Sequence, residues 1–377
     1  MLTSSGCEHA LARAAEQYRA LHQAYAGSGG IPRSFADGQV NLVDASDWTS
    51  GFVAGSFWTL LEATGDGGFA SAAEHWTLAV ESQKTQTGTH DVGFMLNSSF
   101  GNAHRLRPQA ALAAVLVQGA ASLATRYNAA VGATRSWDFG DWSFPVIVDN
   151  MMNLELLFRA TELGGGSRFA EIAATHAQTT LRDHYRADAS SYHLVDYDPR
   201  SGSVSSQETR QGLHDESVWA RGQAWGLYGF TMSYREAREP AFLEHALRIA
   251  DFLGSDPRIP ADRVPYFDFD APGAAGVPAL RDASAAAITA SALLELARFV
   301  DAKRSASYVA HALEILQSLS SAPYTASPGT NGHFLLLHSV GDYPRGTEVD
   351  AALNYADYYY LEALVRARSH FRATPGQ

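Results

Sequence analysis

Apolar residues recur along most of the chain at the spacing of three and four residues that marks amphipathic helices. The predicted helices lie at residues 8–25, 47–62, 69–82, 91–96, 108–127, 149–163, 168–185, 217–237, 241–253, 282–300, 307–319 and 357–366. The strand pattern is weak and short, with 332–338 as an example. The fold class predicted from this pattern is all-α.

Most of the predicted helices form consecutive pairs, as in αα-hairpins. The first helix has no partner before it and the last has none after it, so these two can pair and close a ring of six hairpins. The chain is therefore predicted to be a single (α/α)6-barrel domain covering residues 1–377. In such a ring one helix of each pair lines the centre, and we expect the helices that begin at an Asp to do so.

The helix predicted at 149–163 begins at Asp149, which is followed by an apolar run. Asp91 precedes another predicted inner helix in the same way. Both carboxylates are candidates for general acid–base chemistry at the mouth of the ring. The alternative is that each one caps its helix, because an Asp at a helix start accepts hydrogen bonds from the first free N–H groups.

Polar and aromatic residues concentrate in the loops before the predicted inner helices. If these loops meet at one mouth, they form a pocket suited to carbohydrate, since Trp and Tyr rings stack on sugars and planar polar groups bind hydroxyls. The candidate binding residues are Trp48, His90, His193, Gln211, Trp219, Arg221 and Trp225. Several have a structural alternative: His193 as a hydrogen-bonded structural residue, Arg221 in an ordinary pair with Asp215, and Trp48 and Trp225 as core.

The composition is 46% hydrophobic, 11% aromatic and 18% charged, with a formal net charge of -12. This is a soluble globular composition, and the negative charge argues against a nucleic-acid partner. A single cysteine, Cys7, excludes an internal disulfide framework. No signal peptide and no membrane-spanning run are predicted, so we expect a cytoplasmic protein.

No metal-binding spacing, phosphate-binding glycine loop or Gly-x-Ser-x-Gly elbow occurs in the sequence. We therefore predict no metal and no cofactor. For the oligomeric state we expect a monomer or a weak homodimer.

The chain resembles the unsaturated glucuronyl hydrolases, glycoside hydrolase family 88, over nearly its whole length. The residues that carry the resemblance are Asp47-Trp48-Thr-Ser-Gly-Phe, His90-Asp91-Val-Gly-Phe, Asp149 with Asn153-Leu154, Ser191-Tyr192-His193, Gln211-Gly212, Trp219-Ala-Arg221-Gly-Gln-Ala-Trp225-Gly-Leu-Tyr-Gly-Phe, Arg281-Asp282-Ser284-Ala285 and Asp357-Tyr-Tyr-Tyr-Leu-Glu-Ala-Leu. The family is built on an (α/α)6 barrel, in agreement with the hairpin pattern.

The resemblance implies removal of a 4,5-unsaturated uronic acid from the non-reducing end of oligosaccharides made by polysaccharide lyases. In that chemistry a general acid protonates C4 of an enol ether, water adds at C5, and the resulting hemiketal rearranges and expels the aglycone. The resemblance assigns the acid–base role to Asp149, and hydroxyl contacts and charge stabilisation to Asp91. It places the remaining candidates around the unsaturated sugar.

One loop departs from the family pattern. Members that act on sulfated glycosaminoglycan disaccharides carry Ser-x-x-Ser-x-Lys before the last helix, where this chain has Asp342-Tyr-Pro-Arg345-Gly-Thr347. Arg345 restores one positive charge and is a further candidate for substrate binding. We hypothesise an aglycone that is unsulfated or unusually substituted.

Three alternatives remain open at this point. The first is an unsaturated rhamnogalacturonyl hydrolase acting on pectin fragments. The second is a sugar epimerase on the same ring fold, and the third is a carbohydrate-binding toroid without catalysis.

Overall fold

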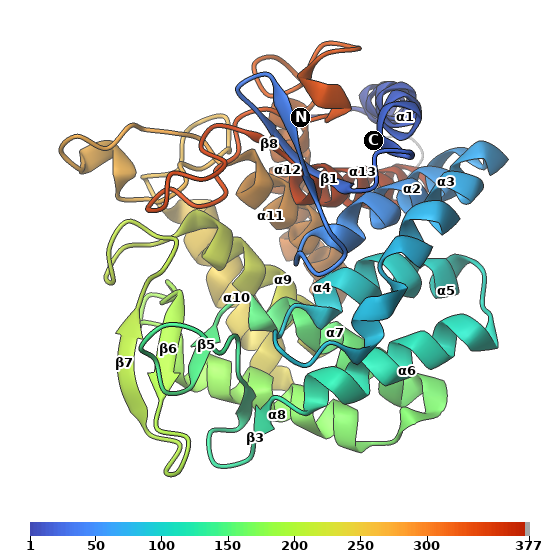
Figure 1. Cartoon of the computed structure of the whole chain (residues 1–377). Helices are drawn as coiled ribbons and strands as arrows, with labels where there is room; N and C mark the ends of the chain where they lie inside the picture. Colours follow the sequence, from blue (N-terminus) through green and yellow to red (C-terminus); the bar gives the residue numbers. More distant parts are fainter. Residues whose placement is uncertain (374–377) are drawn as a thin grey trace.

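The computed structural model describes residues 1–373, and helices dominate it (Figure 1). Six inner helices, each in contact with the next, form a closed ring. They are α2 (Ser50–Thr64), α4 (Val92–Leu96), α7 (Asn150–Ala160), α9 (Ala220–Ala237), α11 (Ala283–Leu296) and α13 (Asn354–Ala373). The contact between α13 and α2 closes the ring.

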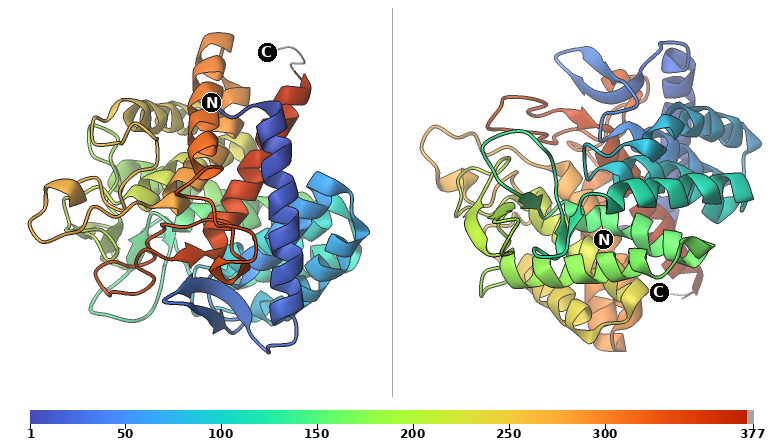
Figure 2. Two further views of the ribbon diagram at one scale, coloured as in Figure 1. Left: turned by 90° about the horizontal axis from the view of Figure 1, so that it is seen from above. Right: turned by 60° about the horizontal axis from the view of Figure 1, so that its bottom comes forward.

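Six outer helices surround this ring, and each packs on at least one inner helix. They are α1 (Ser4–Tyr25), α3 (Gly67–Ala79), α6 (Ala110–Ala124), α8 (Arg168–Asp183), α10 (Pro240–Ser255) and α12 (Ala302–Leu319). The first helix, α1, lies alongside the last, α13, in the left view of Figure 2. The predicted (α/α)6 barrel is therefore confirmed, including the pairing of first and last helices that closes it.

Two inner helices differ from the prediction in how they continue or begin. The helix predicted at 91–96 continues past α4 through a π-helical turn (Asn97–Gly101) into α5 (Asn102–Leu106). The last helix begins at Asn354, so Asp357 lies one turn inside α13 and not at its head.

Short strands hold the loops at the rim. The hairpin of β1 (Ile31–Ala36) and β2 (Gln39–Val43) adds β8 (Ala352–Leu353), and a second sheet has the order β5 (Pro145–Ile147), β6 (Leu194–Tyr197), β7 (Val204–Glu208). A two-stranded ribbon joins β3 (Tyr127–Asn128) to β4 (Ala133–Thr134). The predicted strand at 332–338 is wrong: the segment starts in a 3-10 turn (Asn331–His333), and the positive φ angles of Gly332 and His333 are incompatible with an extended strand.

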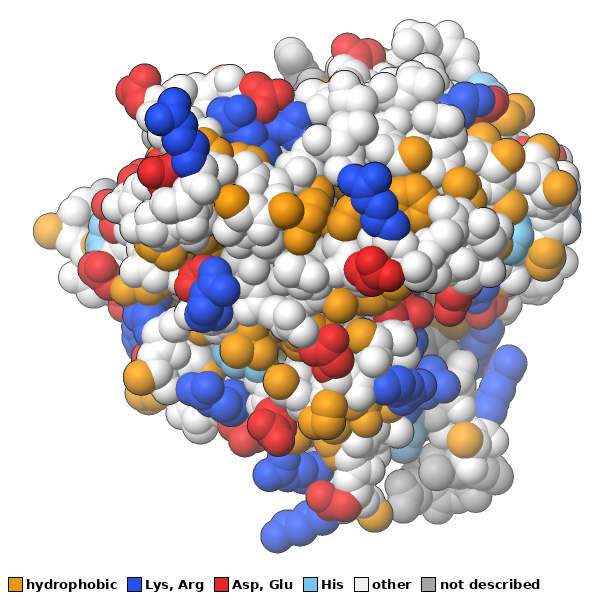
Figure 3. All heavy atoms as spheres, turned by 90° about the horizontal axis from the view of Figure 1, so that it is seen from below, with side chains coloured by type: hydrophobic (Ala, Val, Ile, Leu, Met, Phe, Trp, Pro, Cys, Tyr) orange, Lys and Arg blue, Asp and Glu red, His pale blue; other side chains and the backbone are white. Residues whose placement is uncertain are grey.

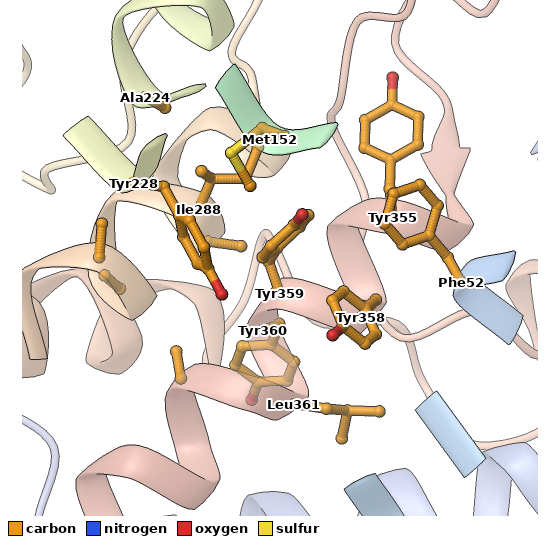
Figure 4. Packing of buried hydrophobic residues seen from close by; sticks show 14 of the residues in the cluster. Phe52, Met152, Ala224, Tyr228, Ile288, Tyr355, Tyr358, Tyr359, Tyr360 and Leu361 are labelled. Carbon is orange, nitrogen blue, oxygen red and sulfur yellow. The ribbon is translucent and has the colours of Figure 1, made fainter. Parts of the chain in front are cut away.

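Aromatic rings fill the centre of the barrel. Tyr359 lies in the middle of the view in Figure 4, with Tyr228, Tyr358 and Met152 around it. The Tyr359 ring centroid lies 5.5 Å from that of Tyr228 and 5.3 Å from that of Trp225. These buried rings therefore form a packed core between the two ends of the barrel.

A cavity of about 850 Å³ lies where the inner helices end, away from the loops that precede them. Arg235 pairs there with Glu155 and Glu295, and Arg366 lies 2.8 Å from Glu295. These charges come from the later turns of four inner helices and largely pair with one another. The ion pairs at this end therefore connect neighbouring inner helices.

Asp357 ties three distant segments together. Its carboxylate accepts hydrogen bonds from the backbone N–H groups of Leu335 (2.8 Å) and Leu336 (3.0 Å) and from the hydroxyl of Tyr18 (3.2 Å). Burial raises the pKa of this carboxyl to about 7. The segment before the last helix is thereby fixed to α13 and to α1.

We predict that Asp357→Asn lowers the free energy of unfolding by about 1–3 kcal/mol, because the amide leaves at least one buried N–H without an acceptor. Because the folded pKa is raised, the wild-type carboxyl also stabilises the fold fully below its unfolded pKa, and this contribution is lost as pH rises through about 7. Urea titrations at several pH values check both effects. The control is Asp66→Asn at the N-cap of α3, since Asn caps a helix as well as Asp does. Equal stability of the two variants would contradict the prediction.

Candidate active site

The sheet β5–β6–β7 places Asp149 beside His193. Val146 pairs with Val195 across β5 and β6, and the N–H of Val148 donates to the carbonyl of His193 at 2.9 Å. Asp149 follows directly at the start of α7. Its Oδ2 lies 3.6 Å from Nε2 of His193, which is too long for a hydrogen bond.

Backbone contacts determine which nitrogen of the His193 ring carries the proton. Its Nδ1 accepts hydrogen bonds from the N–H groups of Arg210 (3.0 Å) and Gln211 (3.2 Å). The proton of the neutral ring must therefore be on Nε2, the nitrogen that faces Asp149. Asp149 Oδ2 and His193 Nε2 are both buried and have no hydrogen-bond partner. Such a pair is available to a bound molecule.

Asp91 is held at both of its carboxylate oxygens. Oδ1 lies 3.2 Å from Nε2 of His90, and Oδ2 accepts a hydrogen bond from the hydroxyl of Thr89 at 2.6 Å. Burial raises the pKa of the Asp91 carboxyl; His90 and Thr89 oppose the shift, and the nearby charge of Asp149 adds to it. The two predicted catalytic carboxylates thus lie close enough to influence each other.

Neither carboxylate caps its helix. Asp91 and Asp149 occupy the positions before α4 and α7, but their side chains make no capping hydrogen bond. Asp282 does cap, because it accepts from the N–H groups of Ser284 and Ala285 at the start of α11. The capping alternative is therefore wrong for Asp91 and Asp149.

Arg221 has a different partner from the one considered in the sequence. It lies 3.2 Å from Asp282, and it donates to the carbonyl oxygens of Val340 and Gly341. The alternative pair with Asp215 is wrong, because Asp215 accepts from the N–H of Thr209 instead. Through these hydrogen bonds Arg221 joins the loop before α13 to α9. The side chain is 1% exposed, and its Nε has no hydrogen-bond partner.

The predicted aromatic residues divide between the rim and the core. Trp48 is half-buried, with its ring 4.9 Å from that of Tyr355, and Trp219 lies 4.5 Å from the ring of His193. Trp225 is fully buried and packs against Phe94 at 5.2 Å. It offers no exposed face for stacking, although its indole N–H is buried without a partner.

Gln211 and Arg345 lie on the loops around these residues. The amide of Gln211 donates to the carbonyl of Gly341 at 3.1 Å. Arg345 lies 2.8 Å from Asp342 and donates to the carbonyl of Arg210 at 3.1 Å. Both therefore join the 210–211 segment to the loop before α13.

An aromatic cluster whose residues were not among the predicted site residues borders this loop. The rings of Trp137 and Phe139 stack at 5.0 Å, and the Arg210 guanidinium lies 4.5 Å from the Phe139 ring centroid. Phe139 is 52% exposed. The density of Trp and Phe at 137–144 was the only sequence signal.

Asn153 also escaped the sequence prediction as a site residue. It lies one turn after Asp149 and is 1% exposed, and its Oδ1 accepts from the N–H of Phe94 at 2.7 Å. A Cβ on Gly93 would lie 2.5 Å from the Asn153 Cα. The glycine therefore permits the close approach of α4 and α7 that brings Asp91 and Asp149 together. In the sequence, the available signal for Asn153 was its position four residues after Asp149, on the same face of the helix.

Within residues 1–373, no group of three or more His, Cys, Asp or Glu side chains is arranged to hold a metal ion. No helix in the same range combines the length and apolarity needed to cross a membrane. On the face shown in Figure 3, Lys and Arg side chains are interspersed with Asp and Glu.

The comparisons with known proteins relate the chain to one enzyme family. No family model matches the chain. The chain is 43% identical over 348 residues to an unsaturated glucuronyl hydrolase of Formosa agariphila. The matched segment covers 91% of this chain and 86% of the relative. A crystal structure of an unsaturated glucuronyl hydrolase specific for heparin superposes with a TM-score of 0.94 at 46% identity, covering 98% of this chain and 99% of that one.

A second similar structure contains a ligand. It is a variant of the unsaturated glucuronyl hydrolase from Streptococcus agalactiae in complex with dGlcA-GalNAc6S, with a TM-score of 0.81 and 28% identity. The match covers 97% of this chain and 92% of that one. A relative with the same fold thus binds an unsaturated disaccharide.

We predict that Gly93→Ala separates α4 from α7, lowers the free energy of unfolding by about 1–3 kcal/mol and reduces any activity of the site. The added methyl group would also lie 2.7 Å from Oδ1 of Asn153. Gly254→Ala is the matched control, since that helical glycine has nothing within 4 Å of the new Cβ. Thermal unfolding and activity of the two variants check the prediction, and a Gly93→Ala protein as stable and active as Gly254→Ala would contradict it.

Proposed function

The chain belongs to the unsaturated glucuronyl hydrolases, glycoside hydrolase family 88, and we propose that it releases 4,5-unsaturated glucuronic acid from the non-reducing end of lyase-generated oligosaccharides. The observation that carries the proposal is the buried, unpartnered pair of Asp149 Oδ2 and His193 Nε2, with the held carboxylate of Asp91 nearby. A proton donor and a second carboxylate are what hydration of the sugar's C4=C5 enol ether requires.

Asp149 is the proposed general acid. Its free Oδ2 delivers a proton to C4, and positive charge develops at C5 and the ring oxygen. The resulting carboxylate then takes a proton from the water that adds at C5, which restores the acid. The hemiketal opens, and the hemiacetal left at C1 expels the aglycone as an alcohol.

Asp91 and His193 complete the proposed reaction centre. The carboxylate of Asp91 lies where a negative charge stabilises the cation that develops in the sugar ring, and it can accept a hydroxyl proton. The N–H of His193, directed towards Asp149 by the backbone contacts at Nδ1, has no partner and is free to donate to a substrate oxygen. Both contributions depend on groups that are already oriented.

The remaining predicted residues are proposed to form the walls around the sugar. Trp48, half-buried beside Tyr355, presents a ring surface, whereas Trp219 is buried and supports the ring of His193. Trp225 contributes its indole N–H, and Arg221 its free Nε. Gln211, Arg221 and Arg345 also hold the loop before α13 against the site, and His90 supports Asp91.

We also propose that the whole chain acts as one catalytic domain, since one hydrophobic cluster runs from Leu2 to Ala367. Its single cysteine, Cys7, is buried and donates to the carbonyl of Leu364, which suits a reducing compartment such as the cytoplasm. A monomer or weak homodimer remains our proposal for the assembly.

We predict that Asp149→Asn lowers turnover of unsaturated disaccharides by about 10²- to 10⁴-fold while substrate still binds, because the amide has no acidic proton to give. Turnover is followed by loss of the ultraviolet absorbance of the conjugated double bond, and binding by calorimetry. The panel includes unsaturated rhamnogalacturonyl disaccharides, and product masses distinguish addition of water from epimerisation. Asp301→Asn, at the cap of the outer helix α12, is the control. Full turnover by Asp149→Asn would refute the mechanism.

The loop before α13 bears on the aglycone. Arg345 lies 2.8 Å from Asp342, so the one positive charge that replaces the family's sulfate-binding pattern is already paired. We propose that the preferred aglycone lacks sulfate at the position that this pattern recognises, because the carboxylate of Asp342 repels an anion there.

We predict that the wild-type chain has a higher kcat/KM for an unsulfated disaccharide than for its sulfated counterpart. Asp342→Ser should narrow the difference several-fold, because it removes a negative charge and frees Arg345; added salt should weaken the effect. Glu74→Gln removes one charge from the outer helix α3 and serves as the control. A strong wild-type preference for the sulfated substrate would overturn this specificity.

A further inference from the structure

We propose that Asn153 is a positioning residue: it fixes which nitrogen of His90 carries the proton, and His90 in turn holds Asp91 as a charged carboxylate at the site. Nothing in the sequence resemblance assigns this function to Asn153. The inference rests on the proposed function for the catalytic importance of Asp91, but the state of His90 can be measured without it.

The orientation of the Asn153 amide follows from its partners. The backbone N–H of Phe94 lies 2.7 Å from the side chain and can only donate, so the atom that faces it must be the amide oxygen. The NH2 group then points towards Nδ1 of His90 at 3.2 Å, and it also lies 3.4 Å from the carbonyl of Asp149. A flipped amide would leave Phe94 without an acceptor in a buried position.

This orientation decides the tautomer of His90. A nitrogen that accepts a hydrogen bond from an NH2 group cannot carry a proton, so Nδ1 is bare and Nε2 bears the hydrogen. His90 is 2% exposed, and burial lowers the pKa of its ring, which favours the neutral form. The proton on Nε2 is directed at Oδ1 of Asp91, 3.2 Å away.

Asp91 then has two contacts that favour its ionised form. One is with His90, whose Nε2 lies 3.2 Å from Oδ1, and the other is the hydrogen bond from the hydroxyl of Thr89. They oppose the burial that raises the pKa of this carboxyl. With the opposite tautomer, the lone pair of Nε2 would face the carboxylate, and Asp91 would take up a proton or turn away.

The two carboxylates are thereby linked through one side chain. Asn153 belongs to α7, whose start carries Asp149, and it contacts His90 and Phe94 on either side of Asp91. The charged and titratable groups that face this arrangement are Asp149, His193 and Arg126 around His90, and Asp149 and Asp47 around Asp91. The hydrogen bonds of these groups go to other atoms, so Asn153 is the group that donates to Nδ1 of His90.

The variants Asn153→Ala and Asn153→Asp test the inference. Alanine removes the NH2 donor, whereas aspartate keeps an acceptor for Phe94 and places a second acceptor opposite Nδ1, which draws a proton onto that nitrogen. We expect a fall in kcat of about 10- to 100-fold for both variants, as is usual when a supporting partner of a site residue is lost. We also expect a smaller change in KM and a displaced pH profile of kcat/KM.

The decisive readout is nitrogen NMR of histidine-labelled protein, with the His90 signal assigned from its disappearance in His90→Gln. In the wild-type chain we expect a bare Nδ1 and a protonated Nε2, and in Asn153→Asp a protonated Nδ1. Asn102→Ala is the matched control, because its amide bridges the carbonyl of Ser98 and the hydroxyl of Tyr358 away from His90. This control should leave the His90 signal and kcat unchanged.

The outcomes separate the two proposals. An unchanged His90 signal in Asn153→Asp, or a wild-type kcat and pH profile in both variants, overturns the positioning inference. Full turnover by Asp149→Asn or Asp91→Asn overturns the proposed function instead, while the NMR result still decides the state of His90. If Asn153→Ala is too unstable to study, Asn153→Asp keeps the contact to Phe94 and carries the test.

Discussion

The close contact between α4 and α7 is the constraint on which the rest of the site depends. Gly93 has no room for a side chain against Asn153, so the two helices approach more closely than ordinary side chains allow. At that distance the Asn153 amide reaches the backbone of α4 and the ring of His90. The approach therefore sets both the separation of the two carboxylates and the direction of the hydrogen bonds that hold one of them.

The same logic governs the second histidine. His193 has its Nδ1 occupied by two backbone N–H groups, as His90 has its Nδ1 occupied by Asn153, so each ring presents an N–H to a carboxylate. Asp91 is close enough to its histidine to be bound, and Asp149 is not. In the proposed mechanism the carboxylate of Asp91 serves as a fixed charge, and the unpartnered carboxylate of Asp149 moves a proton.

The barrel supplies a rigid support for this arrangement. Aromatic rings pack its centre, and Arg–Glu pairs join the later turns of the inner helices. The large cavity at that end has most of its charges paired, although Asn97 Oδ1 and Arg159 Nε in its lining have no partner, and the rim at the other end holds the unpartnered atoms of Asp149 and His193.

The sequence by itself determined the hairpin pattern and the ring, because helix periodicity is a local property, and the residue at a helix start was what made Asp91 and Asp149 candidates. It missed β5–β6–β7 and the true start of α13, since short strands and the burial of Asp357 depend on distant neighbours. Only the tertiary structure decided that Asp282 caps a helix while Asp91 and Asp149 do not, that Arg221 pairs with Asp282 and that Asn153 faces His90. Each of these depends on a hydrogen bond whose direction is set by a partner or a neighbouring helix far away in the chain, and residue spacing carries no record of it.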